Sequence, residues 1–123
     1  MKKVNDVELE NIIRDYVNSK MISKPLMVFG NSNQDARIQI VKKIFGDVNF
    51  WKITSKDDNP RSTIPYCLYD VYLGDAYSND ILQNCINIVK RINRPMFCFF
   101  DSSTIKFVPT EIFSKLDIFE YTK

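Results

Sequence analysis

At 123 residues, with 45% apolar and 26% charged residues, the chain has the size and composition of one folded domain with its own core. The net charge of +2 is too small to indicate nucleic acid or a membrane surface as a partner, and no apolar run approaches the ~20 residues that a membrane span needs. The chain contains no histidine, which excludes Ser-His and Cys-His nucleophilic catalysis and most catalytic zinc sites.

The cysteines and the first residues of the chain indicate the compartment. Cys67, Cys85 and Cys98 are odd in number, lie in apolar segments and form no CxxC pair, so we expect buried, reduced thiols. The segment 1–6 is charged and leads into an acidic stretch, which is not the pattern of a secretory signal. The sequence therefore predicts a cytoplasmic protein.

The first half of the chain predicts a helix, a strand and a second helix. Asn5 and Glu8 form a capping-box pair, and apolar residues then recur at helical spacing over 9–17. A strand follows over 26–29, and a second helix over about 33–45. Gly46 stands where the end of a helix favours a residue in the left-handed conformation.

The second half continues this alternation of strands and helices. We expect strands over 50–54, 66–73, 96–100 and 117–121, a hydrophilic loop over 55–63, a helix from about 78–80 to before Pro95, and one or two helical turns over 109–115. The consecutive apolar residues of 96–100 are typical of a strand buried on both faces of a parallel sheet. The order predicts one three-layer α/β domain over 1–123, with a mostly parallel five-stranded sheet and helices on both faces.

The connection between the first predicted strand and its helix carries the clearest motif. Over 30–37, an apolar strand stops at Gly30, passes through small polar residues and enters a helix. This is the layout of a phosphate-binding loop, GxxxxGK followed by Ser or Thr, in which backbone N–H groups cradle phosphates and the lysine reaches their outer oxygens. On that pattern, Asp35 replaces the second glycine, Ala36 replaces the lysine, and Arg37 replaces the hydroxyl that binds magnesium.

With its predicted strands, helices and motifs in this order, the chain resembles the nucleotide-binding core of AAA+ proteins. Within that family it resembles the initiator, helicase-loader and clamp-loader-like branch. The helix around 4–19 resembles the one that precedes that core, and Asp70 and Val71 stand where the family has its second acidic motif. The segment 97–103 resembles the buried strand that ends in a polar sensor residue. The passage 108–119 resembles the family's stretch of Leu-Pro followed by Ser-Arg-Leu or Ser-Arg-Phe, and Lys115 stands in the place of the arginine that reaches a neighbouring subunit's nucleotide. Nearly the whole chain takes part, although no motif is intact.

The resemblance implies a P-loop NTPase-like core that does not hydrolyse ATP. Asp70 matches the magnesium-associated aspartate, but Val71 replaces the acid that would activate water. The helical lid that follows this core in the family does not appear by residue 123. We therefore expect no catalytic residue, no metal and no cofactor. Any nucleotide binding is expected to be weak and to use Gly30, Asn31, Ser32, Asn33, Arg37 and Asp70.

Each of these features also has a plain structural interpretation. The segment 30–37 is compatible with a simple strand-to-helix turn, whose tight geometry a glycine permits. Asp70 and Asp101 end two strands, where paired carboxylates hold magnesium in receiver domains, but helix capping or solvent exposure explains them as well. Cations are stabilising near helix C-termini, so a nucleic-acid face is the less favoured interpretation of the basic residues Lys42, Lys43, Lys90, Arg91 and Arg94.

The resemblance implies an accessory or regulatory protein that binds another protein in DNA replication. We expect the partner to contact Tyr77, Lys106 and Lys115, on surfaces left open by the missing lid, and the chain to be a monomer or a small symmetric dimer. Two alternatives stay open. One is a nucleotide-dependent switch with an unorthodox phosphate loop, and the other is a receiver- or flavodoxin-like ligand-binding domain that uses Asp70, Asp101 and Ser102.

Overall fold

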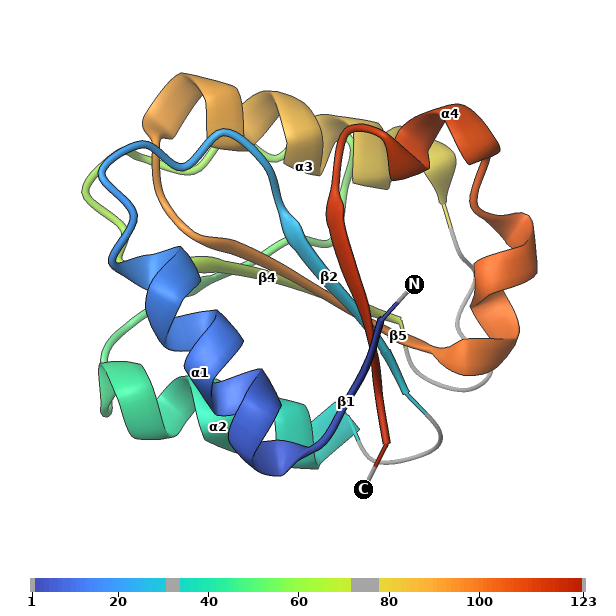
Figure 1. The fold of residues 1–123 in the computed structure, drawn as a ribbon. Helices are drawn as coiled ribbons and strands as arrows, with labels where there is room; N and C mark the ends of the chain where they lie inside the picture. The colour runs from blue at the N-terminus through green and yellow to red at the C-terminus, as the bar shows by residue number, and fades with distance from the viewer. Residues whose placement is uncertain (1, 31–33, 72–77, 123) are drawn as a thin grey trace.

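Strands and helices alternate along the chain, and the helices lie on both faces of one sheet (Figure 1). The computed structural model describes residues 2–30, 34–71 and 78–122. The elements, in chain order, are β1 (Lys2–Val4), α1 (Asp6–Val17), β2 (Leu26–Gly30), α2 (Gln34–Phe45), β3 (Trp51–Lys52), β4 (Cys67–Val71), α3 (Asn79–Ile92), β5 (Met96–Asp101), the 3-10 helix η1 (Ser102–Phe107), α4 (Thr110–Phe113) and β6 (Asp117–Tyr121). The predicted three-layer α/β architecture is confirmed. None of the helices in the described part of the chain combines the length and the apolar character that a membrane crossing requires.

The sheet has six strands in the order β1-β6-β2-β5-β4-β3, and all the neighbouring strands are parallel. The five strands predicted from the sequence are one too few, because β1 carries no pattern that indicates a strand. It has three residues, and only Val4 is buried. Its place at the edge depends on pairing with β6, and the Thr122 N–H extends this pairing by donating to the Val4 carbonyl at 2.8 Å.

One of the predicted strands is shorter in the structure. The strand predicted over 50–54 is reduced to Trp51–Lys52, because the Asp58 carboxylate accepts from the backbone N–H groups of Thr54 and Ser55 at 2.7 and 3.0 Å. These bonds form a local turn that ends the edge strand. The strand predicted over 66–73 is described as Cys67–Val71, and residues 72–77 lie outside the described part.

The two faces of the sheet carry separate apolar clusters. On one face, alternate strand residues such as Val28 and Phe99 pack against α1 and α2. On the other face, the intervening residues, such as Phe29 and Phe100, pack against α3, η1 and α4. Because both faces are covered, β2 and residues 96–100 are buried throughout, which explains their uninterrupted apolar sequences.

The three cysteines are free and belong to the cluster beneath α3. Cys67 lies on β4, Cys98 on β5 and Cys85 on α3. Burial raises the pKa of the Cys67 thiol to about 12 and the pKa of Cys85 well above its ordinary value. The prediction of buried thiols is confirmed, and burial keeps Cys67 and Cys85 in the protonated, weakly reactive form.

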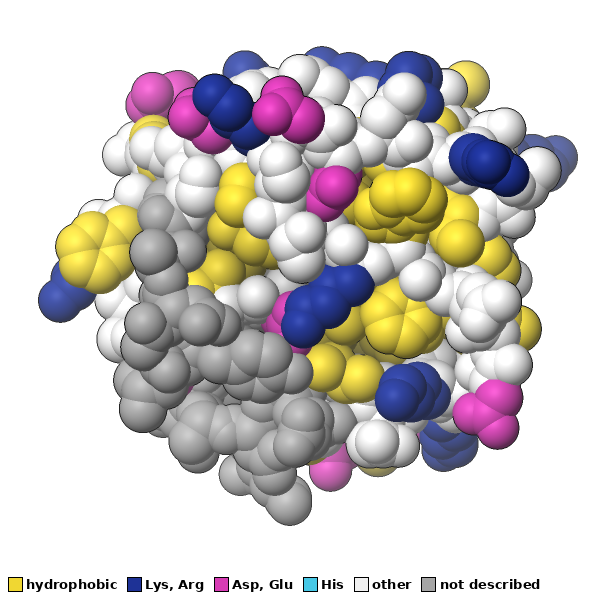
Figure 2. Space-filling view, turned by 180° about the vertical axis from the view of Figure 1, so that it is seen from behind, with side chains coloured by type: hydrophobic (Ala, Val, Ile, Leu, Met, Phe, Trp, Pro, Cys, Tyr) yellow, Lys and Arg dark blue, Asp and Glu magenta, His cyan; other side chains and the backbone are white. Residues whose placement is uncertain are grey.

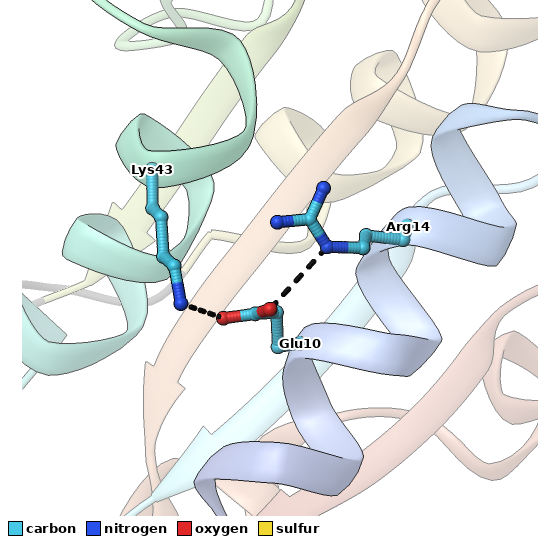
Figure 3. A network of polar contacts seen from close by, with 3 residues as sticks. All are labelled: Glu10, Arg14 and Lys43. Atoms are coloured by element: carbon cyan, nitrogen blue, oxygen red, sulfur yellow. Dashed lines mark hydrogen bonds and ion pairs between the residues drawn. The ribbon is translucent and has the colours of Figure 1, made fainter.

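One glutamate links the two helices that cover the first face. Glu10 on α1 accepts from Lys43 Nζ on α2 at 2.7 Å and from Arg14 Nε at 3.3 Å (Figure 3). The predicted capping box is present at the start of α1, where Asn5 and Glu8 each accept from the other's backbone N–H. The Glu10–Lys43 pair therefore joins α1 to α2, and the capping box fixes the first turn of α1.

Two further contacts hold the segment between α1 and β2 at the amino edge of the sheet, where the parallel strands begin. The Tyr16 hydroxyl donates to the Lys24 carbonyl at 2.7 Å and accepts from the Met96 N–H at 3.0 Å. Asn93, in the left-handed conformation at the end of α3, accepts from the Ile22 N–H at 2.7 Å. The ends of α1 and α3 and the starts of β2 and β5 therefore meet at this edge.

Candidate functional site

The polar residues indicated by the sequence lie at the carboxyl edge of the sheet, where the parallel strands end. β2 ends at Gly30 and β5 at Asp101, and α2 begins just past the end of β2. In open α/β sheets, ligands bind at this edge. Residues 31–33 and 72–77 follow two of these strands, so the predicted site residues Asn31, Ser32, Asn33 and Tyr77 fall outside the described part of the chain.

Arg37 lies inside the fold and not on its surface. Its side chain is 0% exposed, and the guanidinium lies over two aromatic rings, with Cζ 5.9 Å from the ring centres of both Phe99 and Tyr121. Nη2 donates to the Phe100 carbonyl at 3.4 Å, whereas Nε and Nη1 have no hydrogen-bond partner within the described residues. Arg37 is thus a core residue in this structure, whereas the sequence predicted that it faces a bound anion.

Gly30 leaves the space that this guanidinium occupies. A Cβ atom at residue 30 would overlap Nη1 of Arg37 and lie 2.9 Å from its Cζ. Burial lowers the pKa of Arg37 to about 10, and the nearby Tyr121 and Asp101 oppose that shift. The two ring faces and the Phe100 carbonyl offset part of the cost of removing this charge from water.

Tyr121, the last residue of β6, lies beside the same guanidinium. Its hydroxyl donates to the carboxylate of Asp6 at the start of α1. Burial and this hydrogen bond raise the pKa of Tyr121 to about 12. The sequence reasoning missed this pair, because 115 positions separate the two residues and no local pattern connects them.

Asp70 lies within β4 and not at its exposed end. The strand continues to Val71, and Asp70 stands opposite Phe99 of β5. Its side chain is 1% exposed, and its Oδ1 is 3.6 Å from Nζ of Lys52, whose own side chain is 53% exposed. The magnesium-associated aspartate implied by the resemblance is therefore held in a partly shielded ion pair with β3, and sequence reasoning did not indicate Lys52 as its partner.

Asp101 caps the next element, as the structural interpretation of the sequence predicted. Its carboxylate accepts from the Ser103 N–H at 2.8 Å and begins η1, and its carbonyl accepts from the Thr104 hydroxyl at 2.7 Å. Among the described residues, no group of three or more Cys, Asp or Glu side chains is arranged to hold a metal ion. The two carboxylates of the receiver-like alternative, Asp70 and Asp101, are thus accounted for by structural contacts.

The described residues of the predicted partner surface lie on the segment that follows β5. Lys106 and Lys115 are both exposed, and Nζ of Lys106 lies 5.2 Å from the ring centre of Phe107. Phe107 is 59% exposed. It is the one aromatic residue among the exposed large apolar residues in the described part of the chain. Sequence reasoning missed Phe107, since its neighbours in the chain do not distinguish it from a core residue.

Comparisons with protein-family models, with curated proteins and with solved structures found no match to this chain. The strand order itself bears on one alternative. Flavodoxin-like and receiver domains have the order 2-1-3-4-5, whereas here β2 lies between β5 and β6, and β3 lies at the far edge. The topology therefore argues against the flavodoxin-like alternative and is consistent with a P-loop-like three-layer fold.

Proposed function

We propose that this chain is a non-catalytic, AAA+-like accessory or regulatory protein that acts by binding another protein in DNA replication. The observation that carries the proposal is the burial of Arg37 and Asp70. Both occupy positions at which the AAA+ frame handles magnesium, and both are buried in contacts that support the fold. The link to replication comes from the family resemblance alone.

The chemistry available at the carboxyl edge supports the non-catalytic part of the proposal. Phosphoryl transfer depends on a lysine at the outer phosphates, magnesium held by a hydroxyl and a carboxylate, and a positioned water. The chain has Ala36 in place of the lysine, Arg37 in place of the hydroxyl, and the buried Val71 in place of the acid that activates water. Loss of even one preorganised electrostatic group typically costs about 10²–10³ in rate. We therefore expect no ATP turnover above background.

The segment 102–116 supports the protein-binding part. An exposed aromatic ring is a common element of protein interfaces because it supplies apolar area, and lysines beside it suit the polar rim of such an interface. Phe107, Lys106 and Lys115 offer this combination, and Tyr77 remains a predicted member of the same surface. The proposed state of the free chain is a monomer or a small symmetric dimer, which light scattering tests.

A thermal-unfolding screen with ATP, ADP and FMN, each with and without magnesium, tests whether the chain binds a nucleotide or a flavin specifically. A ligand at 100 times its Kd adds about 2.7 kcal/mol to the free energy of unfolding, so specific binding is readily seen. We expect no shift of that size. A large magnesium-dependent shift with ATP would instead support the nucleotide-dependent switch, and a shift with FMN would support the ligand-binding alternative.

Affinity capture from the cells that express the chain tests the partner surface. Wild type is compared with Phe107→Ala and with the double variant Lys106→Glu/Lys115→Glu. We expect both variants to lose a protein that the wild type retains, with thermal unfolding midpoints unchanged, because these side chains are exposed. Retention of every captured protein by both variants would overturn this assignment of the surface.

A further inference from the structure

We propose that the amino edge of the sheet binds the phosphate backbone of nucleic acid. This activity lies beyond the proposed protein-binding function and uses different residues. The surface, called the basic edge below, consists of exposed residues from three separate parts of the chain: Lys20, Lys24, Arg61, Lys90, Arg91 and Arg94.

The topology brings these residues to one edge. Lys20 and Lys24 lie between α1 and β2, and Arg61 lies between β3 and β4. Lys90 is in the last turn of α3, and Arg94 lies just before β5. Because all the strands are parallel, each connection that leads into a strand lies at the amino edge. In Figure 2, several Lys and Arg side chains lie along the upper edge and the upper right of the molecule, with Asp and Glu side chains among them at the upper left.

Specific contacts hold the three parts together around the end of α3. Arg91 Nη1 donates to the Pro60 carbonyl at 3.4 Å, and Arg94 Nε donates to the Ser62 carbonyl at 2.7 Å. These two bonds fix the chain on either side of Arg61. On the other side of the helix end, the bond between the Ile22 N–H and Asn93 fixes the segment that carries Lys20 and Lys24. These hydrogen bonds therefore fix the three segments of the basic edge relative to one another.

The charge of this surface is not neutralised within the described structure. None of its lysines or arginines forms an ion pair among the described residues, where the ion pairs involve Glu10, Asp70 and Glu120. Five carboxylates lie in or beside the same connections, those of Asp15, Asp47, Asp57, Asp58 and Asp117. The Asp58 carboxylate already accepts from the Thr54 and Ser55 N–H groups, and the six cations outnumber the carboxylates. The net charge of +2 for the whole chain thus conceals a concentration of positive charge at one edge.

A groove within the basic edge offers further groups of the kind that contact nucleic acid. It has a volume of about 310 Å³ and is lined by Met21, Ile22, Ser23, Lys90 and Asn93. Hydroxyl, amide and ammonium groups are the side chains that position a phosphate and its sugar. Lysine is depleted from the centres of protein–protein interfaces. The surface of the groove is mostly apolar, with Ser23, Lys90 and Asn93 as its polar members, and it is the exposed cations around it that favour a phosphate backbone over an acidic protein.

Fluorescence anisotropy tests the proposal with a fluorescein-labelled oligothymidylate of about 30 nucleotides and with a DNA duplex of about the same length. We expect binding of at least one of them at about 50 mM salt, with an affinity that falls as the salt rises to about 200 mM. Lys24→Glu/Lys90→Glu should lower the affinity at least tenfold and reduce the salt slope by about 2, since each lost phosphate contact removes about 1. Neither lysine side chain makes a hydrogen bond or an ion pair within the described residues, so the fold should be preserved.

The matched control is Lys56→Glu/Lys106→Glu, which makes the same change in net charge at two exposed lysines that follow the carboxyl ends of β3 and β5, and which leaves Lys115, just before β6, unchanged. It should retain DNA binding while weakening protein capture through Lys106, and Lys24→Glu/Lys90→Glu should show the opposite pattern, so the two proposals fail separately. If the glutamate variant does not fold, Lys24→Gln/Lys90→Gln decides the question by a smaller loss of affinity. No binding to either DNA, equal losses in both double variants, or displacement of DNA by polyglutamate of equal charge would overturn the proposal.

Discussion

The guanidinium of Arg37 occupies the space in which a side chain of residue 30 would begin. A Cβ atom at position 30 would overlap Nη1, so the buried arginine in this position requires glycine at residue 30. Gly30 is not in the left-handed region of backbone conformation, in which only Gly46 among the described glycines lies. The glycine that resembles the first residue of a phosphate loop is thus explained by packing as well as by resemblance.

Gly30→Ala should destabilise the fold through this overlap. Overpacking in a dense core typically costs about 1–3 kcal/mol, and Arg37 is fully buried, so its guanidinium has little room to move aside. Urea denaturation gives the loss in the free energy of unfolding. The control is the same substitution in an Arg37→Met background, where the overlap is absent and the loss should be much smaller. An equal loss in both backgrounds would contradict the relationship.

Phe99→Ala should be among the most damaging single changes. Phe99 is 0% exposed at the centre of the sheet, between β2 and β4, and it carries one of the rings beneath Arg37. Truncation of a buried phenylalanine typically costs about 3–5 kcal/mol, which is enough to unfold a marginally stable domain. Phe107→Ala is the matched control, because that ring is 59% exposed and its loss should change stability by no more than about 0.5 kcal/mol. Similar denaturation midpoints for the two variants would contradict the described core.

Stability should fall as the pH rises above 9. Burial raises the pKa of Cys67 from 9.0 to about 12, so the folded state keeps a proton that the unfolded chain has lost. Between these two values the folded state binds more protons, and the free energy of unfolding decreases as pH rises, by at most about 1.4 kcal/mol per pH unit for one group. Cys67→Ala removes this group, and its stability should depend less steeply on pH over the same range. Parallel curves for the variant and the wild type would exclude this contribution.

The ion pair between Glu10 on α1 and Lys43 on α2 should stabilise the fold at neutral pH, and this stabilisation should be lost in acid. The Lys43 hydrogen bond, together with Arg14, lowers the pKa of Glu10 below its ordinary 4.5. A carboxylate with a lowered pKa contributes stability above its unfolded pKa, and this contribution is lost as the pH falls through its folded pKa. Glu10→Gln should therefore lie slightly below the wild type in thermal unfolding at pH 7, and the difference should vanish in acid and shrink in high salt. A difference that persists at pH 2.5 would assign the effect to packing and not to charge.

The sequence by itself determined the elements whose signals are local. The apolar run 26–29 indicated a strand, and the run 96–100 indicated a strand buried on both faces of a parallel sheet; both lie at the centre of the sheet, buried on both faces. Asn5 and Glu8 indicated a capping box, which is present at the start of α1. These predictions succeeded because hydrophobic periodicity and capping depend on residues only a few positions apart.

Only the tertiary structure decided the parts that depend on distant residues. β1 is a strand because β6, from the other end of the chain, pairs with it. Arg37 is a core residue because Phe99 and Tyr121 supply ring faces and Gly30 supplies space. The cations of the basic edge, which read in sequence as separate helix ends and loops, come together because parallel strands all begin at one edge. Local patterns contain no information on such pairings, since contact energy between residues far apart in the chain depends on where the fold places them.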